Sequence, residues 1–306
     1  MYIIRCSKAY PDLALAELQA YNPSAKYISQ GLYSSNTINH LSLLAQVTHA
    51  YEHVYTGDLE QSPLLLTDNT FSVRTAKCTD LEKKNAQAFI YYSQKKPVVR
   101  LENPDEEYFC QKVEKNTYVF GKLIYTNKTI YSINSQKEVI HFKPITLAKK
   151  LARTLVNLSG VEKGVIHDPF CGFGGIVYEA LECEHITIGT DIDTQMIQGA
   201  TEYLQSLTSD KLKLSIDDAL TTTIQSDAIV SDLPFGKATK NISSTLYKDF
   251  LVHVKNTKIT KKLVLGFPDF HNPLEIIKDC GLQPTHIFTI YIHKSLSRII
   301  VVIPIN

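Results

Sequence analysis

The feature that most constrains the fold of this chain is an unbroken succession of strand, glycine-containing loop and helix at 165–179, VIHDPFCGFGGIVYE. From residue 144 onward, short apolar strands alternate with amphipathic helices around this segment. Such alternation predicts a parallel sheet with helices on both faces. The last two strands, 285–293 and 297–305, are joined by a short loop, which predicts that one strand of the sheet runs antiparallel. We therefore predict an α/β fold for residues 144–306.

The first 143 residues follow a different rhythm. They contain a strand at 2–6, a helix at 11–21 and a strand–turn region. The pattern then predicts a second apolar helix at 38–54, four short strands and one more helix, with the later elements at 70–78, 81–94, 97–104, 107–113 and 118–126. We predict two small α+β domains here, covering residues 1–60 and 61–143.

The composition is that of a globular protein, with 44% hydrophobic and 21% charged residues in a chain of 306. No apolar run approaches the roughly 18–20 residues that cross a bilayer, and the acidic residues near the start argue against a signal peptide. These features predict a cytoplasmic protein without a membrane segment. None of the six cysteines forms a CxxC pair, so no metal site is predicted. The net charge of only +1 does not by itself point to a nucleic-acid partner.

The glycine loop has the features of a ligand site. Gly172, Gly174 and Gly175 allow close approach of the backbone, and the helix that begins near Gly175 points its amide groups at the loop, where a carboxylate would be favoured. Asp168 precedes the first glycine. A carboxylate there would repel a pyrophosphate but bind an ammonium group. Cys171 lies in the same loop; it is more simply a structural thiol than a nucleophile, because the sequence offers no base beside it.

Further acids follow the next strands. Asp191 ends the strand at 185–191, near the offset from the glycine loop at which an acid meets ribose hydroxyls. Asp193 is predicted to cap the helix that begins at Thr194. Asp218 follows the third strand and is placed either to reach an adenine amino group or to remain a solvated turn residue.

The fourth strand ends in Ser231-Asp232-Leu233-Pro234-Phe235, beyond the carboxyl end of the sheet, where open α/β folds bind ligands. An exocyclic amine of a nucleobase is a weak nucleophile, because its lone pair is delocalised into the ring. The Asp232 carboxylate and a carbonyl of the rigid Leu233-Pro234 backbone would accept the two N–H groups and favour the pyramidal, reactive amine. The Phe235 ring offers a stacking face for a flipped base; the simpler reading is a core phenylalanine after a turn.

In this order, DPFCGFGG, GTDID and DLPFG resemble the amino-group methyltransferases that carry a D/N-P-P-Y/F motif. Residues 147–182 are similar to the same stretch of the THUMP-containing tRNA guanine-N2 methyltransferases, above all the archaeal and eukaryotic group that modifies guanosine 10. HKSLSR at 293–298 is similar to the histidine-basic-Ser-Leu-Thr-Arg segment that ends those enzymes. FSVR at 71–74 and VRLENPDEEYF at 99–109 resemble the THUMP signature, and the start of the chain resembles the ferredoxin-like domain that precedes it.

The resemblance implies a Rossmann-like class I methyltransferase domain at 144–306, a ferredoxin-like domain at 1–60 and a THUMP-like RNA-binding domain at 61–143. It implies S-adenosyl-L-methionine as cofactor and tRNA as substrate, gripped by the first two domains. Some relatives also need a small zinc-binding activator subunit. The implied cofactor residues are Asp168, Pro169, Phe170, Gly172, Gly174, Asp191, Ile192, Asp218 and Ala219. The implied catalytic residues are Asp232, Pro234 and Phe235.

Two positions depart from the family pattern. Leu233 replaces the first proline of the commoner D-P-P-Y form, and Phe173 replaces a small Ser or Thr beside the cofactor loop. Two other functions remain open. An adenine-N6 methyltransferase would use the same loop geometry on RNA or DNA, and a non-catalytic RNA-binding protein would retain the fold without the reaction. The sequence favours the guanine-N2 reaction, since the THUMP-like half suits RNA and the 232–235 loop is intact.

Overall fold

The computed structural model describes residues 1–59, 65–67, 69–88, 90–91, 98–129, 147–207, 210–235, 245–293 and 296–306. The chain forms two compact units. Unit 1 comprises residues 1–42 and 46–129, and unit 2 comprises residues 43–45 and 130–306. In the part of the chain that the structure describes, no helix is both long and apolar enough to cross a membrane.

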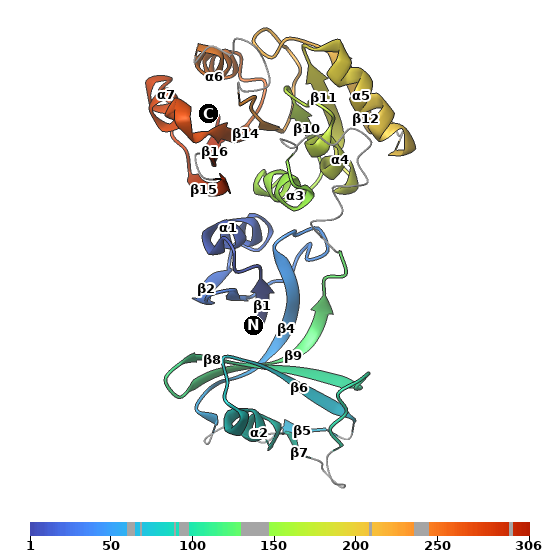
Figure 1. The fold of residues 1–306 in the computed structure, drawn as a ribbon, viewed down its shortest axis with the longest axis vertical. Helices are drawn as coiled ribbons and strands as arrows, with labels where there is room; N and C mark the ends of the chain where they lie inside the picture. Colours follow the sequence, from blue (N-terminus) through green and yellow to red (C-terminus); the bar gives the residue numbers. More distant parts are fainter. Residues whose placement is uncertain are drawn as a thin grey trace. The chain divides into compact units, whose positions relative to one another are not determined.

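Unit 1 is built on one seven-stranded sheet (Figure 1). Across the sheet, its strands are β2 (Lys26–Ser29), β3 (Leu32–Ser35), β1 (Tyr2–Cys6), β4 (Val47–Gly57), β9 (Thr117–Thr126), β8 (Glu106–Glu114) and β6 (Phe71–Ala76). Neighbouring strands are antiparallel except β6 and β8. Helices α1 (Pro11–Tyr21) and α2 (Asp80–Ala88) and the short pair β5 (Leu65–Leu66) and β7 (Ile90–Tyr91) complete the unit. The sheet contains strands from both sides of residue 60, and the division into ferredoxin-like and THUMP-like domains stays a prediction.

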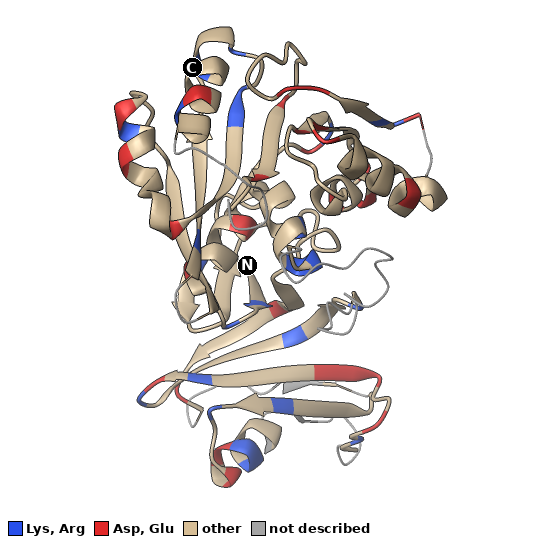
Figure 2. Cartoon of the chain, turned by 45° about the horizontal axis from the view of Figure 1, so that its top comes forward, with Lys and Arg blue, Asp and Glu red and all other residues tan. Residues whose placement is uncertain are grey.

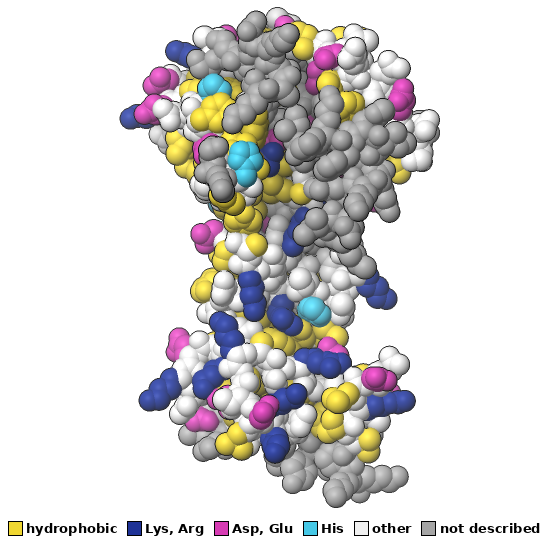
Figure 3. Space-filling model, in the orientation of Figure 1, with side chains coloured by type: hydrophobic (Ala, Val, Ile, Leu, Met, Phe, Trp, Pro, Cys, Tyr) yellow, Lys and Arg dark blue, Asp and Glu magenta, His cyan; other side chains and the backbone are white. Residues whose placement is uncertain are grey.

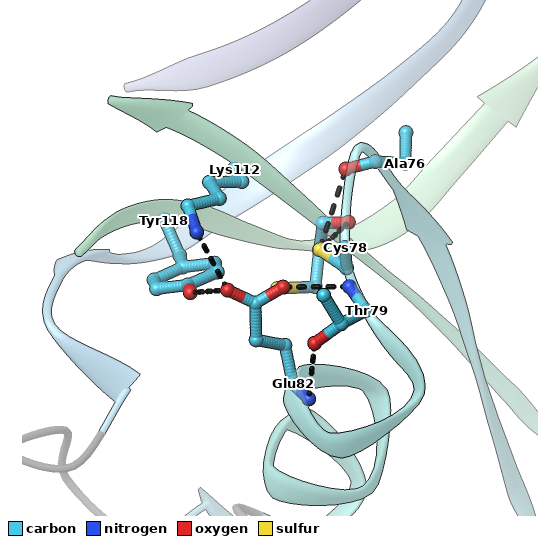
Figure 4. Close-up of polar contacts among 7 residues, drawn as sticks. Ala76, Cys78, Thr79, Glu82, Lys112 and Tyr118 are labelled. Atoms are coloured by element: carbon cyan, nitrogen blue, oxygen red, sulfur yellow. Dashed lines mark hydrogen bonds and ion pairs between the residues drawn. The ribbon is translucent and has the colours of Figure 1, made fainter. Parts of the chain in front are cut away.

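Helix α2 is fixed to this sheet through Glu82 (Figure 4). Thr79 and Glu82 cap the helix reciprocally: the Thr79 amide donates to Glu82 Oε2 (2.6 Å), and the Glu82 amide donates to Thr79 Oγ1 (3.3 Å). The other carboxylate oxygen accepts hydrogen bonds from Lys112 of β8 (2.7 Å) and Tyr118 of β9. The Lys112 ammonium is the main reason why the pKa of Glu82 falls to about 2. This network explains the position of α2 without any ligand.

Three expectations for unit 1 were wrong in part. The helix expected at 38–54 is absent: 38–46 is a series of turns and bends, and β4 follows as a strand between β1 and β9. Strand β4 forms backbone hydrogen bonds with β1 on one side and β9 on the other. These bonds outweigh the helix propensity of the segment, which is a weak preference. The strand expected at 97–104 is reduced, over its described residues, to one bridge between Phe71 and Val99. The helix expected at 81–94 ends at Ala88, and the described residues that follow pair with β5.

Unit 2 contains a second seven-stranded sheet (Figure 1). Across it, the strands are β12 (Leu212–Ile216), β11 (Ile186–Asp191), β10 (Val165–Asp168), β13 (Ala228–Asp232), β14 (Lys262–Pro268), β16 (Leu296–Pro304) and β15 (His286–His293). The first five pair in parallel, and β16 is antiparallel to both of its neighbours. The predicted α/β sheet with one antiparallel strand is therefore confirmed.

The helices of unit 2 are α3 (Lys149–Leu158), α4 (Gly175–Glu182), α5 (Thr194–Leu204), α6 (Thr245–Thr257) and α7 (Pro273–Asp279), with single 3-10 turns η3 (Gln205–Leu207) and η4 (Asp269–His271). Residues 263–268 of β14 are all buried, as expected for a central strand covered on both faces. Alternate residues of that strand, Leu263, Leu265 and Phe267, join the core cluster of α6 and α7.

Candidate active site

The strand order of unit 2 places its first strand, β10, in the middle of the sheet. The chain proceeds from β10 to β11 and β12 on one side, then crosses to β13 and β14 on the other. Ligands in open α/β sheets bind beyond the carboxyl ends of the strands at such a switch point. Asp168 ends β10 and Asp232 ends the neighbouring β13. The topology therefore brings the two predicted site loops to one edge of the sheet.

Asp168 lies at this edge of the sheet and is 2% exposed. Its Oδ1 accepts hydrogen bonds from the Ser231 hydroxyl (2.6 Å) and the Phe170 amide (3.2 Å). Burial raises the pKa of Asp168 to about 7, and the nearby acids Asp191 and Asp232 add to that effect. A carboxylate in this position is best stabilised by a cation that enters the crevice.

The glycine loop leaves space above the start of α4. Gly172 and Gly174 adopt left-handed backbone angles, with φ of 51° and 84°, which side chains other than glycine rarely tolerate. Apart from the adjoining backbone, a Cβ placed on Gly172 or Gly175 would meet no atom of the described residues within 4 Å. The open volume lies at a helix N-terminus beside a buried acid, so the residues present fit the carboxylate and ammonium of a methionine moiety.

Asp191 supports the same loop. Its Oδ2 accepts the Gly172 amide and its Oδ1 accepts the Asp193 amide, both at 3.0 Å. The Ile192 amide also bonds this carboxylate, which offers about four acceptor positions, so one remains for a ligand. The Asp193 side chain in turn accepts the Gln195 amide at 2.8 Å, which confirms the predicted cap of α5. Ile192 is 70% exposed, and such an apolar side chain beside the loop suits a flat ligand.

The remaining predicted cofactor residues have local partners. Asp218 Oδ1 accepts the Leu220 amide (2.9 Å), so the carboxylate braces its own turn. Ala219 packs into the core cluster, which leaves its backbone as the part able to meet a ligand. Pro169 is buried, and the Phe170 ring meets Phe250 of α6 edge-on at 5.2 Å between centroids.

Cys171 and Phe173 also lie in this loop. Burial raises the pKa of the Cys171 thiol, so its position does not favour a nucleophile. The Phe173 ring packs over Gly199 of α5, where an added Cβ would lie 2.4 Å from the ring. The bulky residue that departs from the family pattern is thus accommodated by a glycine on the neighbouring helix.

Asp232 does not lie alone at the end of β13. Arg298 of β16 binds its carboxylate through two bonds, Nε to Oδ1 (2.8 Å) and Nη2 to Oδ2 (2.9 Å). The side chains are 18% and 9% exposed. Strand β14 separates these two strands, and the pair meets over Gly266, where a Cβ would lie 2.3 Å from Asp232 Oδ1. Sequence reasoning missed this pairing, although HKSLSR had marked the segment that carries Arg298.

The residues after Asp232 explain the unusual form of the motif. Leu233 is 1% exposed, and its amide donates to the Gly266 carbonyl at 2.9 Å. A proline at 233 has no N–H and would lose that bond. The Pro234 carbonyl accepts the Tyr247 hydroxyl at 2.6 Å, so the Leu233 carbonyl is the other backbone acceptor of this turn. The Arg298 guanidinium carbon lies 5.0 Å from the centroid of the Phe235 ring.

A separate surface hollow of about 700 Å³ occurs in unit 1, lined by Arg74, Lys122 and the segment 101–107, which contains four acidic residues. Its lining mixes both charges and offers no glycine loop or helix N-terminus. The switch point of unit 2 therefore remains the better candidate for chemistry.

Comparison with known proteins identifies the family of the second unit. A family model described as UPF0020, RMKL-like methyltransferase domain, matches residues 139–297. Over 174 residues the chain is 34% identical to a protein of Methanothermobacter thermautotrophicus named tRNA (guanine(10)-N2)-dimethyltransferase; this match covers 53% of the chain. Over 107 residues it is 32% identical to a Bos taurus protein named U6 snRNA (guanine-N(2))-methyltransferase THUMPD2, covering 33% of the chain. The matches span 50% of the archaeal protein and 21% of the bovine one, so the chain corresponds to about half of its archaeal relative.

Among solved structures, TrmN from Thermus thermophilus matches with a TM-score of 0.52 and 16% identity, over 100% of this chain and 99% of that one. At that identity the likeness shows the fold, which is that of class I S-adenosylmethionine-dependent methyltransferases, as predicted. With its glycine loop, its acid-lined switch point and a family model that covers half of its length, the chain belongs to the UPF0020 family of RMKL-like methyltransferase domains.

Proposed function

We propose that this chain transfers a methyl group from S-adenosyl-L-methionine to the exocyclic N2 amine of a guanine in tRNA, at guanosine 10. The observation that carries the proposal is the meeting of two acids on neighbouring strands, Asp168 beside the glycine loop and Asp232 in the DLPF turn. One suits a cationic cofactor and the other suits an amine substrate. The cofactor, when bound, supplies a methyl group on a sulfonium, which needs only a correctly presented nucleophile.

The cofactor side of the crevice is assigned to the first acid and the loop around it. Asp168 would bind the α-ammonium, and the open space at Gly172 and Gly175 would receive the carboxylate near the first amides of α4. Asp191 would accept the ribose hydroxyls. Ile192, Asp218 and Ala219 would border the adenine, and Pro169 and Phe170 would close the loop.

The substrate side is assigned to the 232–235 turn. The Asp232 carboxylate and the Leu233 carbonyl would accept the two N–H groups of the amine, so that the nitrogen lone pair points at the methyl carbon. The nitrogen–carbon bond forms as the carbon–sulfur bond breaks, and the surplus proton on nitrogen leaves to solvent or to Asp232. Pro234 would hold the turn, and Phe235 would stack on the extruded base.

The choice of guanine rests on the relatives. The archaeal and the bovine proteins act, by their names, on different RNAs but on the same guanine N2 amine. Unit 1 would supply the grip on tRNA, as a ferredoxin-like domain (1–60) and a THUMP-like domain (61–143). Figure 3 shows Lys and Arg side chains over the face of the β6, β8 and β9 region, and Figure 2 shows Asp and Glu interspersed among them. Local basic patches of this kind suit phosphate contacts despite the net charge of +1. A small zinc-binding activator subunit and a cytoplasmic location complete the proposal.

Nucleoside mass spectrometry tests this function directly. Unmodified tRNA transcripts are incubated with the full chain and labelled cofactor, with and without a zinc-binding activator subunit. N2-methylated guanosine is the expected product, and a transcript that carries adenosine at position 10 should remain unlabelled. Labelled N6-methyladenosine would replace the proposal with an adenine methyltransferase. Cofactor binding and tRNA binding without any transfer would leave a non-catalytic RNA-binding protein. Transfer to a U6 snRNA transcript but not to tRNA would retain the guanine-N2 reaction and change the RNA.

A further inference from the structure

Arg298, the last residue of the HKSLSR segment, lies inside the proposed substrate side of the site. Its guanidinium contacts two of the residues assigned there: a two-bond fork to the Asp232 carboxylate, and the face of the Phe235 ring at 5.0 Å. Arg298 comes from β16, two strands away from Asp232, so the contact is made only when the whole sheet is assembled.

We propose that Arg298 is a positioning residue of the amine-activating turn: it clamps the Asp232 carboxylate as an anion in one orientation and braces the Phe235 ring against which the base stacks. This inference rests on the proposed function and deepens it. Arg298 acts through Asp232 and Phe235.

The fork leaves Asp232 able to act. A carboxylate offers about four acceptor positions, and a bidentate guanidinium takes one on each oxygen. The outer positions remain for the N–H of a substrate amine. Because the guanidinium is planar and its two bonds are parallel, the plane of the carboxylate is fixed before the substrate arrives. Gly266 is part of the device, since any side chain there would collide with Asp232.

The clamp also addresses a problem of charge. Burial raises the pKa of Asp232, and the Arg298 charge and its hydrogen bonds lower it again. Among the residues that the structure describes, the other titratable groups that interact with Asp232 are a buried acid, Asp168 on β10, and a buried phenol, Tyr247 on α6. Without Arg298, the pKa of Asp232 would be higher, so its carboxyl group would stay protonated up to a higher pH. A protonated carboxylic acid is a poor acceptor for an amine N–H.

A second buried ion pair of unit 2 provides the control. Arg153 of α3 donates through Nε to Glu179 Oε2 of α4 at 2.7 Å, with side-chain exposures of 9% and 3%. Both pairs join an arginine to a carboxylate, and the two arginine side chains are equally buried, although Glu179 is less exposed than Asp232. The Arg153 pair lies between two helices and contacts neither Asp232 nor Phe235 in any interaction that the structure describes. A role in stability alone predicts the same consequences for both pairs.

Two measurements on the full chain test the proposal. The first is a ¹³C NMR titration of the aspartate carboxyl carbons, with the Asp232 signal assigned by its loss in Asp232→Asn. The second is the pH profile of single-turnover methyl transfer at saturating cofactor. In Arg298→Met, we expect the pKa of Asp232 to rise and the acidic limb of the rate profile to move to higher pH by the same amount. Arg298→Lys keeps the positive charge but not the two-bond fork. The acidic limb of its rate profile should therefore return most of the way to the wild-type pH, while the rate on the pH-independent plateau stays below wild type.

Arg153→Met should lower the melting temperature yet leave the Asp232 pKa and the acidic limb where they are in the wild type. An unchanged Asp232 pKa in Arg298→Met would overturn the proposal, as would an equal movement of the limb in Arg153→Met. If Arg298→Met does not fold, a rate profile of Arg298→Lys that matches wild type in both limb and plateau would also overturn it. Failure of the proposed function would appear differently, as wild-type protein that transfers no methyl group while the NMR titration still responds to Arg298.

Discussion

Two loops of unit 2 begin in the same way and end with opposite electrostatics. Each follows a parallel strand, β10 or β13, and each starts with an aspartate at the switch point of the sheet, buried in Asp168 and partly exposed in Asp232. Asp168 is held by neutral donors, a hydroxyl and an amide, and burial raises its pKa to about 7. Asp232 is held by the two-bond fork of Arg298. Within the described part of the chain, only the second forms an ion pair.

Two carboxylates of the same residue type at the same edge of the sheet can therefore take different roles, according to the groups that hold them. An acid without a cation retains a strong attraction for one, which suits a cofactor that carries an ammonium. An acid whose charge is already balanced gains little from a cation but still accepts hydrogen bonds, which suits a neutral amine. Substitutions in the two loops can separate these two roles, cofactor binding and amine activation.

The largest effect is expected at Asp232, the acid whose charge is balanced by Arg298. Asp232→Ala removes the acceptor for the amine, and the rate of transfer should fall about 10²–10⁴-fold, as when a positioned catalytic group is lost. Cofactor affinity should change little. Single-turnover transfer to a tRNA transcript measures the rate, and calorimetry measures the affinity. Because the change also leaves Arg298 without its anion, Glu179→Ala is the matched control: it uncouples Arg153 in the same way and should retain the rate. Transfer by Asp232→Ala at near the wild-type rate would remove amine activation from the mechanism.

A smaller effect, on affinity alone, is expected on the cofactor side. Asp191→Ala removes a charged acceptor for the ribose hydroxyls, a bond worth about 1.5–3 kcal/mol, so cofactor affinity should fall roughly tenfold to a hundredfold. The same change frees the Gly172 and Asp193 amides, which Asp191→Asn would leave partly bonded. Isothermal calorimetry on both variants separates the two contributions. Unchanged affinity in the alanine variant would exclude Asp191 from the site.

The raised pKa of Asp168 predicts that both stability and cofactor affinity depend on pH. The pKa of Asp168 in the folded protein, about 7, lies above the ordinary value of 3.8, so the folded state favours the protonated form and the free energy of unfolding should fall as pH rises between these values. Binding an ammonium requires the ionised form. Cofactor affinity should therefore decrease up to about tenfold for each pH unit below 7, with release of a proton, and be constant above it. Calorimetry in two buffers of different ionisation heat detects that proton. Asp168→Asn should abolish the dependence, and a wild-type affinity that is constant from pH 6 to 8 would contradict the assignment.

The smallest expected effect tests the open space itself. Apart from the adjoining backbone, a Cβ at Gly175 would meet no atom of the described residues within 4 Å, and the backbone there needs no left-handed angle. Gly175→Ala should therefore leave the melting temperature equal or slightly higher, because alanine is the better helix residue by about 0.5–1 kcal/mol. Cofactor affinity should nevertheless fall about tenfold, or roughly 1.4 kcal/mol, because the methyl group occupies the space assigned to the methionine moiety. Equal affinity in this variant would place the cofactor elsewhere.

Sequence alone predicted unit 2 well, and the reason is local. Its strands are short apolar runs, three of which end at Asp, and its helices are bounded by residues such as Asp193 and Gly281, so these elements carry their own signals. The same signals located both acids of the switch point. Unit 1 lacks them between 38 and 54, where an apolar run with helical spacing becomes turns and a strand because two neighbouring strands pair with it.

The partner of Asp232 could not be predicted in that way. Arg298 is 66 residues away in sequence and meets the carboxylate because β16 returns antiparallel beside β14 and because Gly266 leaves room between them. Strand order across a sheet is a property of the whole fold, which no local pattern encodes. The resemblance of HKSLSR to the family segment marked the region but not its contact.

The central claim is that Asp168 serves the cofactor and Asp232 serves the amine. Its most direct test is to measure, for Asp168→Asn and Asp232→Ala side by side, the cofactor dissociation constant and the single-turnover rate of methyl transfer to tRNA at saturating cofactor. The account predicts a crossed result: Asp168→Asn loses affinity and recovers most of its rate when cofactor saturates, whereas Asp232→Ala keeps its affinity and loses the rate. If both variants lose cofactor affinity, or both lose the rate at saturating cofactor, the two acids share one role. The assignment of Asp168 to the cofactor and Asp232 to the amine is then wrong.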